Sequence, residues 1–245
     1  MMKVSDSVQL PRRAPGAMRA IATACLFLYK AIVYVLSFAG PVYLLTSTWR
    51  SLNAISLVAV ALSGWFLSGL TFLSLLILTK KLFIGNVSEV GCGTIASPLV
   101  RRWFPAAMLI ATLDNGPFRS MTTGMSFVGP WFYRSMGAKM PNSALIGGRT
   151  LIYDPWFLEL GENVTIGTGA AILGHVGDGP DVRLGRVVIG AGAVVGVNSV
   201  IFPDVRIGEN ARIAAGAVVV RGARVGNDEV WGGIPAKRIS VRTAC

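Results

Sequence analysis

Two long apolar segments dominate the first third of the chain. Residues 21–49 are interrupted by one charged side chain, Lys30, and residues 51–79 contain no charged residue. An α-helix needs about 20 apolar residues to span the hydrocarbon core of a bilayer. The pattern therefore predicts a hairpin of two transmembrane helices over residues 21–80.

Basic residues flank this predicted hairpin on its outer ends. They are Arg12, Arg13 and Arg19 in a basic tail at residues 1–20, and Lys80 and Lys81 after the second span. Only Arg50 lies between the spans. Because positive charge gathers on the cytoplasmic side, we expect a multi-pass protein of the cytoplasmic membrane, with both termini and the domain after the hairpin facing the cytoplasm. The alternative, a cleaved signal peptide and a single span, fits less well because the first apolar stretch is too long.

A connector follows at residues 81–140. Short bursts of Trp, Phe and Arg alternate there with Pro and Gly. Interleaved aromatic and cationic residues suit amphipathic helices that lie in the lipid headgroup layer. An ordinary packed connector is the alternative.

A six-residue period begins near Ile146 and continues almost to the end of the chain. Aliphatic residues share one position of it: Leu160, Ile166, Ile172, Ile189, Val195, Ile201, Ile207, Ile213, Val219 and Val225. Small residues recur four positions later, as at Ala193, Ser199, Ala211 and Ala217. This period fits a solenoid in which each coil has three short strands. It predicts a left-handed parallel β-helix, all-β in class, over residues 141–245.

The period breaks once, between Ile172 and Ile189, which are 17 residues apart instead of 18. The break contains the turn-forming run Gly177–Asp181. A loop is therefore expected to leave the prism here, and loops on a rigid scaffold often carry function.

Composition and charge indicate which classes of molecule the protein binds. Apolar residues make up 53% of the chain, mean hydropathy is +0.59 and the net charge is +11. The basic residues are scattered and no nucleic-acid-binding motif is present, so membrane lipids and cofactor phosphates are the expected partners rather than nucleic acid. The three cysteines (Cys25, Cys92 and Cys245) have no spacing that indicates a disulfide framework or a zinc site.

The hexads, a Gly174-His175 loop and the terminal run Trp231–Lys237 (WGGIPAK) resemble the hexapeptide-repeat acyltransferases. The layout of membrane hairpin, connector and Gly137-Ala138-Lys139 resembles the membrane region of peptide synthetases of the polylysine-synthetase type. The acyltransferase resemblance implies a homotrimer in which acyl-CoA, used as co-substrate without a metal, lies in a groove between neighbouring prisms.

His175 is the only histidine, and it corresponds to the general base of that family. Imidazole is well matched to removing a proton from an attacking hydroxyl or amine. Three acids are candidates to orient its second nitrogen: Asp178, Asp154 and Glu162. The N–H of Gly196 is a candidate donor to the thioester oxyanion.

The resemblance also implies residues that bind the cofactor. They are Gly196, Val197, Ala215, Val220 and Arg221 on the later coils, with Lys237 and Arg238 at the phosphates. Val220 and Arg221 stand where the family commonly has Thr-Lys, so a hydroxyl contact is lost while the positive charge is kept.

Two other functions fit the sequence poorly. A carbonic-anhydrase-type β-helix needs three histidines for zinc, and this chain has one, which excludes that function unless other ligand types substitute. A sugar nucleotidyltransferase is not favoured, because no Gly-rich phosphate loop precedes the repeats. The stronger alternative is a non-catalytic, membrane-bound scaffold in a biosynthetic complex. For an enzyme, membrane anchoring favours a lipid-linked or membrane-delivered acceptor.

Overall fold

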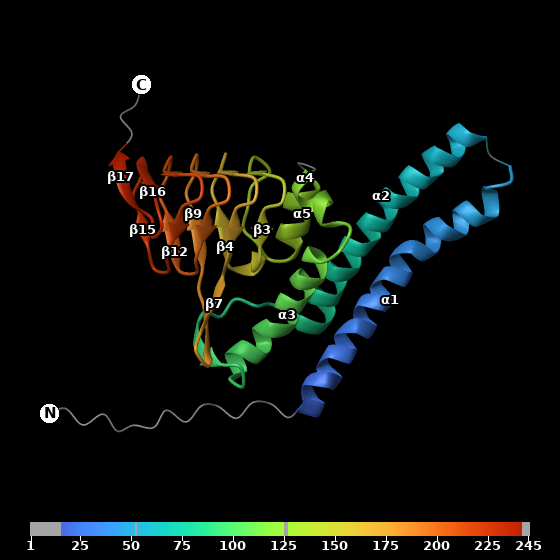
Figure 1. The fold of residues 1–245 in the computed structure, drawn as a ribbon, viewed down its shortest axis with the longest axis horizontal. Helices are drawn as coiled ribbons and strands as arrows, with labels where there is room; N and C mark the ends of the chain where they lie inside the picture. Colours follow the sequence, from blue (N-terminus) through green and yellow to red (C-terminus); the bar gives the residue numbers. More distant parts are fainter. Residues whose placement is uncertain (1–15, 52, 125–126, 242–245) are drawn as a thin grey trace.

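The computed structural model describes residues 16–51, 53–124 and 127–241. The first 15 residues of the predicted basic tail and Cys245 lie outside these ranges. Helices α1 (Gly16–Thr48) and α2 (Ala54–Thr79) form an antiparallel hairpin, and a π-helical turn, η1 (Lys80–Ile84), continues α2 (Figure 1). The side chain of Asn53 caps α2 by accepting a hydrogen bond of 2.9 Å from the backbone N–H of Ser56.

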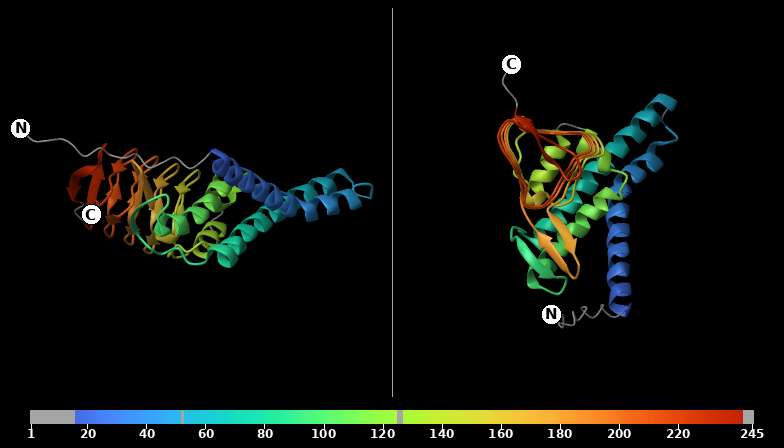
Figure 2. Two further views of the ribbon diagram at one scale, coloured as in Figure 1. Left: turned by 90° about the horizontal axis from the view of Figure 1, so that it is seen from below. Right: turned by 60° about the vertical axis from the view of Figure 1, so that its left-hand side comes forward.

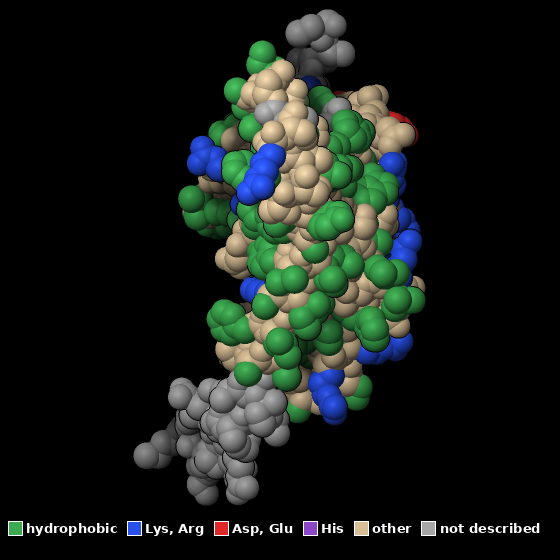
Figure 3. All heavy atoms as spheres, turned by 90° about the vertical axis from the view of Figure 1, so that its right-hand side faces the viewer, with side chains coloured by type: hydrophobic (Ala, Val, Ile, Leu, Met, Phe, Trp, Pro, Cys, Tyr) green, Lys and Arg blue, Asp and Glu red, His purple; other side chains and the backbone are tan. Residues whose placement is uncertain are grey.

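Aromatic contacts join the two helices. The rings of Tyr34 and Phe72 stack with centroids 5.4 Å apart, and the Tyr29 hydroxyl donates a hydrogen bond to Oγ1 of Thr79 at 3.3 Å. The outward faces remain apolar: Phe27, Leu28, Val35, Ile55, Leu62 and Leu67 are all more than half exposed. Figure 3 shows hydrophobic side chains spread over this face of the molecule. Both helices are long and apolar enough to cross a membrane, at residues 23–48 and 54–84.

The connector forms a short strand and three helices. These are β1 (Gly91–Thr94), α3 (Pro98–Asp114), α4 (Arg119–Gly124) and α5 (Val128–Ser135). One face of α3 is buried, and Phe118 packs against Phe38, Trp65 and Phe72 of the hairpin with ring centroids 5.0–5.5 Å apart. The connector is thus a packed joint between hairpin and solenoid. Only its exposed face, with Arg102 and Phe104, is left for the predicted headgroup contact.

The remaining chain winds into the expected parallel β-helix, a triangular prism seen near end-on in the right panel of Figure 2. Its first face contains β2 (Leu145–Ile146), β5 (Thr165–Ile166), β10 (Val194–Val195), β13 (Arg212–Ile213) and β16 (Glu229–Gly232), with β17 (Lys237–Val241) added antiparallel. The second face contains β3 (Leu151–Ile152), β6 (Ala171–Ile172), β11 (Val200–Ile201) and β14 (Val218–Val219). The third contains β4 (Leu158–Leu160), β9 (Val187–Ile189), β12 (Val205–Ile207) and β15 (Arg224–Val225), and the 3-10 turn η2 (Pro155–Phe157) precedes β4.

The register confirms the six-residue period. Val195 pairs with Ile213 on the next coil and with Ile166 on the previous one. The predicted aliphatic positions are buried in the prism, and so are the small residues at its corners, such as Ala193 and Ser199. Corner turns need a left-handed backbone conformation, which Asn198 adopts with φ 55°.

The break in the period is a β-hairpin. Strands β7 (His175–Asp178) and β8 (Asp181–Leu184) pair antiparallel and project from the corner between the second and third faces (Figure 2). Strand β1 of the connector adds to β8, with Gly91 opposite Leu184. The predicted loop is therefore a hairpin that pairs with strand β1, about 90 residues earlier in the chain. No local sequence pattern predicts this pairing.

Candidate active site

His175 lies where β7 leaves the prism, beside a buried carboxylate. Its Nδ1–H donates a hydrogen bond of 2.7 Å to Oδ2 of Asp154, and the backbone N–H of Gly174 donates to the same oxygen at 2.9 Å. Asp154 occupies the same corner one coil earlier, directly before η2, and is 2% exposed. Of the three acids proposed from sequence to orient His175, Asp154 is the one that contacts it.

The other carboxylate oxygen of Asp154 is held by the connector. The indole Nε1–H of Trp103 donates to Oδ1 at 2.6 Å, and its ring packs against the imidazole with centroids 4.7 Å apart. Tyr153 meets the imidazole edge-on at 6.2 Å. Sequence reasoning missed Trp103, because it lies outside the repeat and no spacing relates it to His175.

This arrangement defines the chemistry of the imidazole. A carboxylate that accepts from Nδ1–H favours the tautomer with its hydrogen on Nδ1, which leaves the lone pair on Nε2. Three donors converge on Asp154, so its carboxylate is fully engaged and fixes the ring. The imidazole can then accept a proton through Nε2.

His175 lines a cavity of about 410 Å³ between α3 and the second face. The other lining residues are Trp103, Ala107, Met108, Ala111, Asp114, Asn115, Leu151 and Tyr153. Burial raises the pKa of Asp114 to about 6, although the Arg119 guanidinium lowers it. The cavity thus holds the candidate base and a second titratable group that the sequence did not single out.

The other two acids lie away from His175. Asp178 is at the tip of the hairpin and accepts from Nε of Arg183 at 2.8 Å. Glu162 accepts from the hydroxyl of Ser143 at the corner between the third and first faces. Neither is in contact with the imidazole, so their proposed orienting role is corrected in favour of Asp154.

The residues expected at the cofactor lie on two corners of the prism. Gly196, Val197 and Ala215 share the corner after the first face, and Lys237 pairs there with Gly232, one coil beyond Ala214. The N–H of Gly196 donates to the carbonyl of Ile213 at 2.9 Å within the coil ladder. It is therefore not free for an oxyanion, and that prediction is wrong.

Val220 and Arg221 lie on the next corner, beside the projecting hairpin. With Val176, Gly177, Asp178 and Phe202 they line a hollow of about 300 Å³. Strand β7 borders both this hollow, through Val176, Gly177 and Asp178, and the cavity, through His175. Arg238 lies on β17 and pairs with Glu229 at 3.3 Å.

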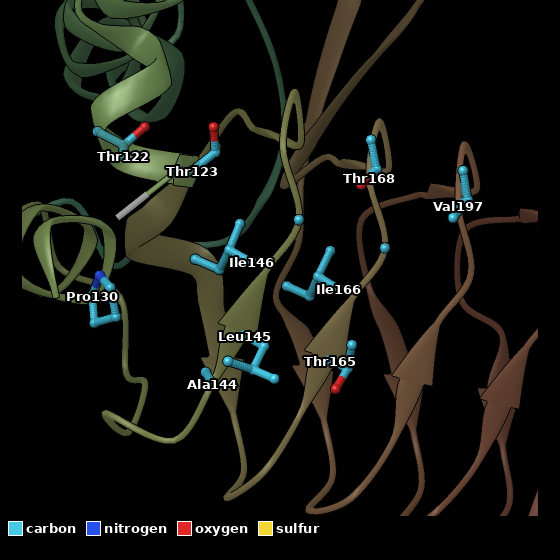
Figure 4. Close-up of a pocket in the computed structure, with 13 residues that line it drawn as sticks. Thr122, Thr123, Pro130, Ala144, Leu145, Ile146, Thr165, Ile166, Thr168 and Val197 are labelled. Carbon is cyan, nitrogen blue, oxygen red and sulfur yellow. The ribbon is translucent and has the colours of Figure 1, made fainter. Parts of the chain in front are cut away.

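Another hollow, of about 400 Å³, opens where α4 and α5 meet the first coils (Figure 4). Thr122, Thr123 and Pro130 face Thr165, Thr168 and Val197 across it. None of its described lining residues is ionisable. It can contribute binding surface near Val197 but no acid or base.

Comparisons with known proteins fit this geometry. The family of bacterial transferase hexapeptide repeats (six repeats) matches residues 186–221. The candidate acetyltransferase YvoF of Bacillus subtilis (strain 168) is 32% identical over 93 residues, which cover 36% of this chain and 54% of YvoF. Residues 186–221 are therefore bacterial transferase hexapeptide repeats.

Two further proteins are similar to parts of this chain. The 2,3,4,5-tetrahydropyridine-2,6-dicarboxylate N-acetyltransferase of Staphylococcus aureus (strain bovine RF122 / ET3-1) is 38% identical over 79 residues, covering 32% of this chain and 31% of that protein. A maltose O-acetyltransferase structure from Clostridium difficile 630 gives a TM-score of 0.48 at 14% identity, covering 66% of this chain and 97% of the other. The chain spans about half or less of the length of the curated relatives it matches.

Proposed function

We propose that the protein is an acyl-CoA-dependent acyltransferase anchored in the cytoplasmic membrane, with His175 as its general base. The observation that carries this proposal is the hydrogen bond from His175 to the buried Asp154, combined with the cavity that His175 lines. A purely structural histidine would not need a carboxylate with three converging donors beside an open cavity.

The proposed step balances as follows. An acceptor O–H or N–H loses its proton to Nε2 of His175 as its oxygen or nitrogen bonds to the thioester carbon. The tetrahedral intermediate then releases the CoA sulfur, which takes the proton from Nε2. Asp154 stabilises the imidazolium between the two transfers. The products are acylated acceptor and free CoA.

The split of the cofactor residues supports a homotrimer. The corner with Val197, Ala215 and Lys237 differs from the corner with Val220 and Arg221, so one prism cannot surround acyl-CoA with both sets. A groove between neighbouring copies can use one corner from each. We place the acyl-carrying arm in the hollow beside β7, next to Arg221, and the phosphates near Lys237 and Arg238.

Membrane anchoring rests on the exposed apolar faces of α1 and α2. Burying those faces in lipid removes a large apolar area from water. Anchoring would also keep the active site close to an acceptor in the membrane, because Phe118 packs the connector directly against the hairpin.

The test uses three variants of the full-length protein: H175A, H175N and D154N. Radiolabelled acetyl-CoA is added to membranes that contain each variant, and label entering lipid, glycan and peptide fractions is measured with CoA release. We expect the rate to fall about 100- to 10,000-fold for H175A and H175N, while acetyl-CoA binding and folding persist. Rates within a few-fold of wild type would overturn the role of His175. Absence of transfer by the wild type, with an intact trimer, would favour the scaffold.

A further inference from the structure

The cavity at His175 extends along α3 well beyond the candidate base. Trp103, Ala107, Ala111 and Asp114 all line it, and their spacing of four, four and three residues places them on one helix face. At 1.5 Å per residue, Trp103 and Asp114 are about 16 Å apart along the axis. His175 packs on Trp103 at one end, and Asp114 marks the other.

The two ends differ from the middle in polarity. Ala107, Met108, Ala111 and Leu151 provide an apolar wall between them. Among the described lining residues, Asp114 and His175 are the ionisable ones apart from Tyr153. A ligand that fills the cavity would therefore have an apolar stem and one charged or polar group at each end.

The negative charge of Asp114 is incompletely neutralised. Among the described residues, Asp114 forms an ion pair with Arg119, whose Nε approaches Oδ1 at 3.3 Å, while Nη2 of Arg119 donates to the carbonyls of Arg149 and Thr150 at 2.9 and 2.8 Å. Asp114 is also the last residue of α3, where the helix dipole adds negative potential. Burial raises the pKa of Asp114, and the charge of Arg119 offsets only part of that effect.

We infer that this cavity is the acceptor site, and that it takes an elongated amine whose ammonium group binds Asp114 while its reacting O–H or N–H reaches His175. The inference rests on the proposed function for the identity of the reacting end. It assigns the acceptor a chemical class: a chain of mainly apolar stem with a cationic end about three helical turns from the nucleophile. The acyl donor would reach His175 from the hollow that borders β7.

The probes are α,ω-diaminoalkanes of increasing length, with α,ω-diols of equal length as neutral controls. Calorimetry on the detergent-solubilised full chain measures binding to the wild type, H175A, D114N and D204N. D204N is the matched control, because Asp204 is an arginine-paired carboxylate that does not line this cavity.

We expect diamines to bind wild type and D204N alike, with an optimum length, and to bind D114N at least about 10-fold more weakly, the loss typical of a charge-assisted contact. H175A should keep the preference for diamines over diols, because that preference depends on Asp114. Equal binding to D114N, or no preference of the wild type for diamines over diols, would overturn the inference. If D114N does not fold, Ala111→Leu decides, because it fills the middle of the cavity and keeps the carboxylate. Wild-type binding by A111L would also overturn the inference.

A kinetic arm separates this inference from the proposed function. If the diamine is acetylated, D114N should raise its KM with little change in kcat, whereas H175A should lower kcat. Asp114-dependent binding without any transfer would leave the acceptor site standing and refute the transferase. Transfer by D114N with the wild-type KM would leave the transferase standing and refute the acceptor site.

Discussion

The indole Nε1–H of Trp103 donates a 2.6 Å hydrogen bond to Oδ1 of Asp154 across 51 residues of sequence. This bond joins the connector to the β-helix at the candidate site. Asp154 needs it because its carboxylate is buried and an unpaired buried oxygen is costly. The orientation of His175 therefore depends on the docking of α3, because Trp103 of α3 holds the carboxylate that accepts from the imidazole.

Trp103→Phe tests that dependence. Phenylalanine keeps an aromatic ring against His175 but removes the donor to Asp154, which costs about 1.5–3 kcal/mol for a bond to a charged group. We expect the acyl-transfer rate to fall roughly 10- to 100-fold, with a shifted pH–rate profile and unchanged acyl-CoA affinity. Trp131→Phe, at an exposed site on α5, is the control. A rate and pH profile equal to wild type for W103F would show that Asp154 alone orients the imidazole.

The charges around the hairpin predict that both termini face the cytoplasm. Basic residues flank both spans on one side, so reporters fused to either terminus should be active in the cytoplasm. Acyl-CoA is available on the same side. A C-terminal fusion that is active only outside the cytoplasm would contradict both the orientation and the proposed donor.

Assembly should be trimeric. Because the cofactor residues occupy two corners of one prism, we expect a detergent-corrected mass of three chains. Arg221→Glu in one tagged copy and Lys237→Glu in another should show complementation in mixed trimers. At some interfaces the intact Lys237 corner of the first copy then meets the intact Arg221 corner of the second, which restores a complete site. A stable monomer with full activity would exclude the shared site.

Amine binding should depend on pH through Asp114. In the folded protein this carboxyl ionises at about pH 6, so binding should be strong above pH 6 and fade as the pH drops through it. The other charged or titratable groups described nearby are Arg119, Tyr153, which lines the cavity, and Tyr133, whose pKa burial raises to about 12. The titration is measured in H175A, which removes the imidazole from the cavity, and compared with H175A/D114N. A pH-independent affinity in H175A would argue against a carboxylate contact.

The same shift has a consequence for stability. The pKa of Asp114 is above its ordinary value of 3.8, so the native state holds this proton more tightly than the unfolded state. Its contribution to the free energy of unfolding therefore increases as the pH falls from above 6 toward 4. D114N should remove that part of the pH dependence in thermal melts.

The aliphatic ladder should dominate the stability of the prism. Ile201 is fully buried on β11, so Ile201→Ala leaves a cavity and should cost about 2–5 kcal/mol. Ile234→Ala makes the same change at a side chain that is 76% exposed and should cost less than about 0.5 kcal/mol. Similar melting temperatures for the two variants would mean that the coils are held by their backbone ladders alone.

The repeat pattern predicted much of the candidate site. His175 stood out because it was the single histidine and lay beside the one break in the period, and the candidate acids included Asp154. Choosing Asp154 over Asp178 and Glu162 required the coil geometry: Asp154 shares the corner of His175 one turn earlier, whereas Glu162 lies on another corner.

The sequence by itself determined the β-helix and the apolar hairpin, because both depend on local patterns. In the β-helix every sixth side chain points inward, which produces the six-residue period. In the hairpin, two long apolar segments have the length and composition of membrane-spanning helices. Tertiary structure alone decided what the connector does. Trp103, Asp114 and β1 reach the site through packing between segments 50 to 100 residues apart, where no period relates the partners. The cavity beside His175 exists only because α3 docks on the prism, so its shape and charge follow from that contact.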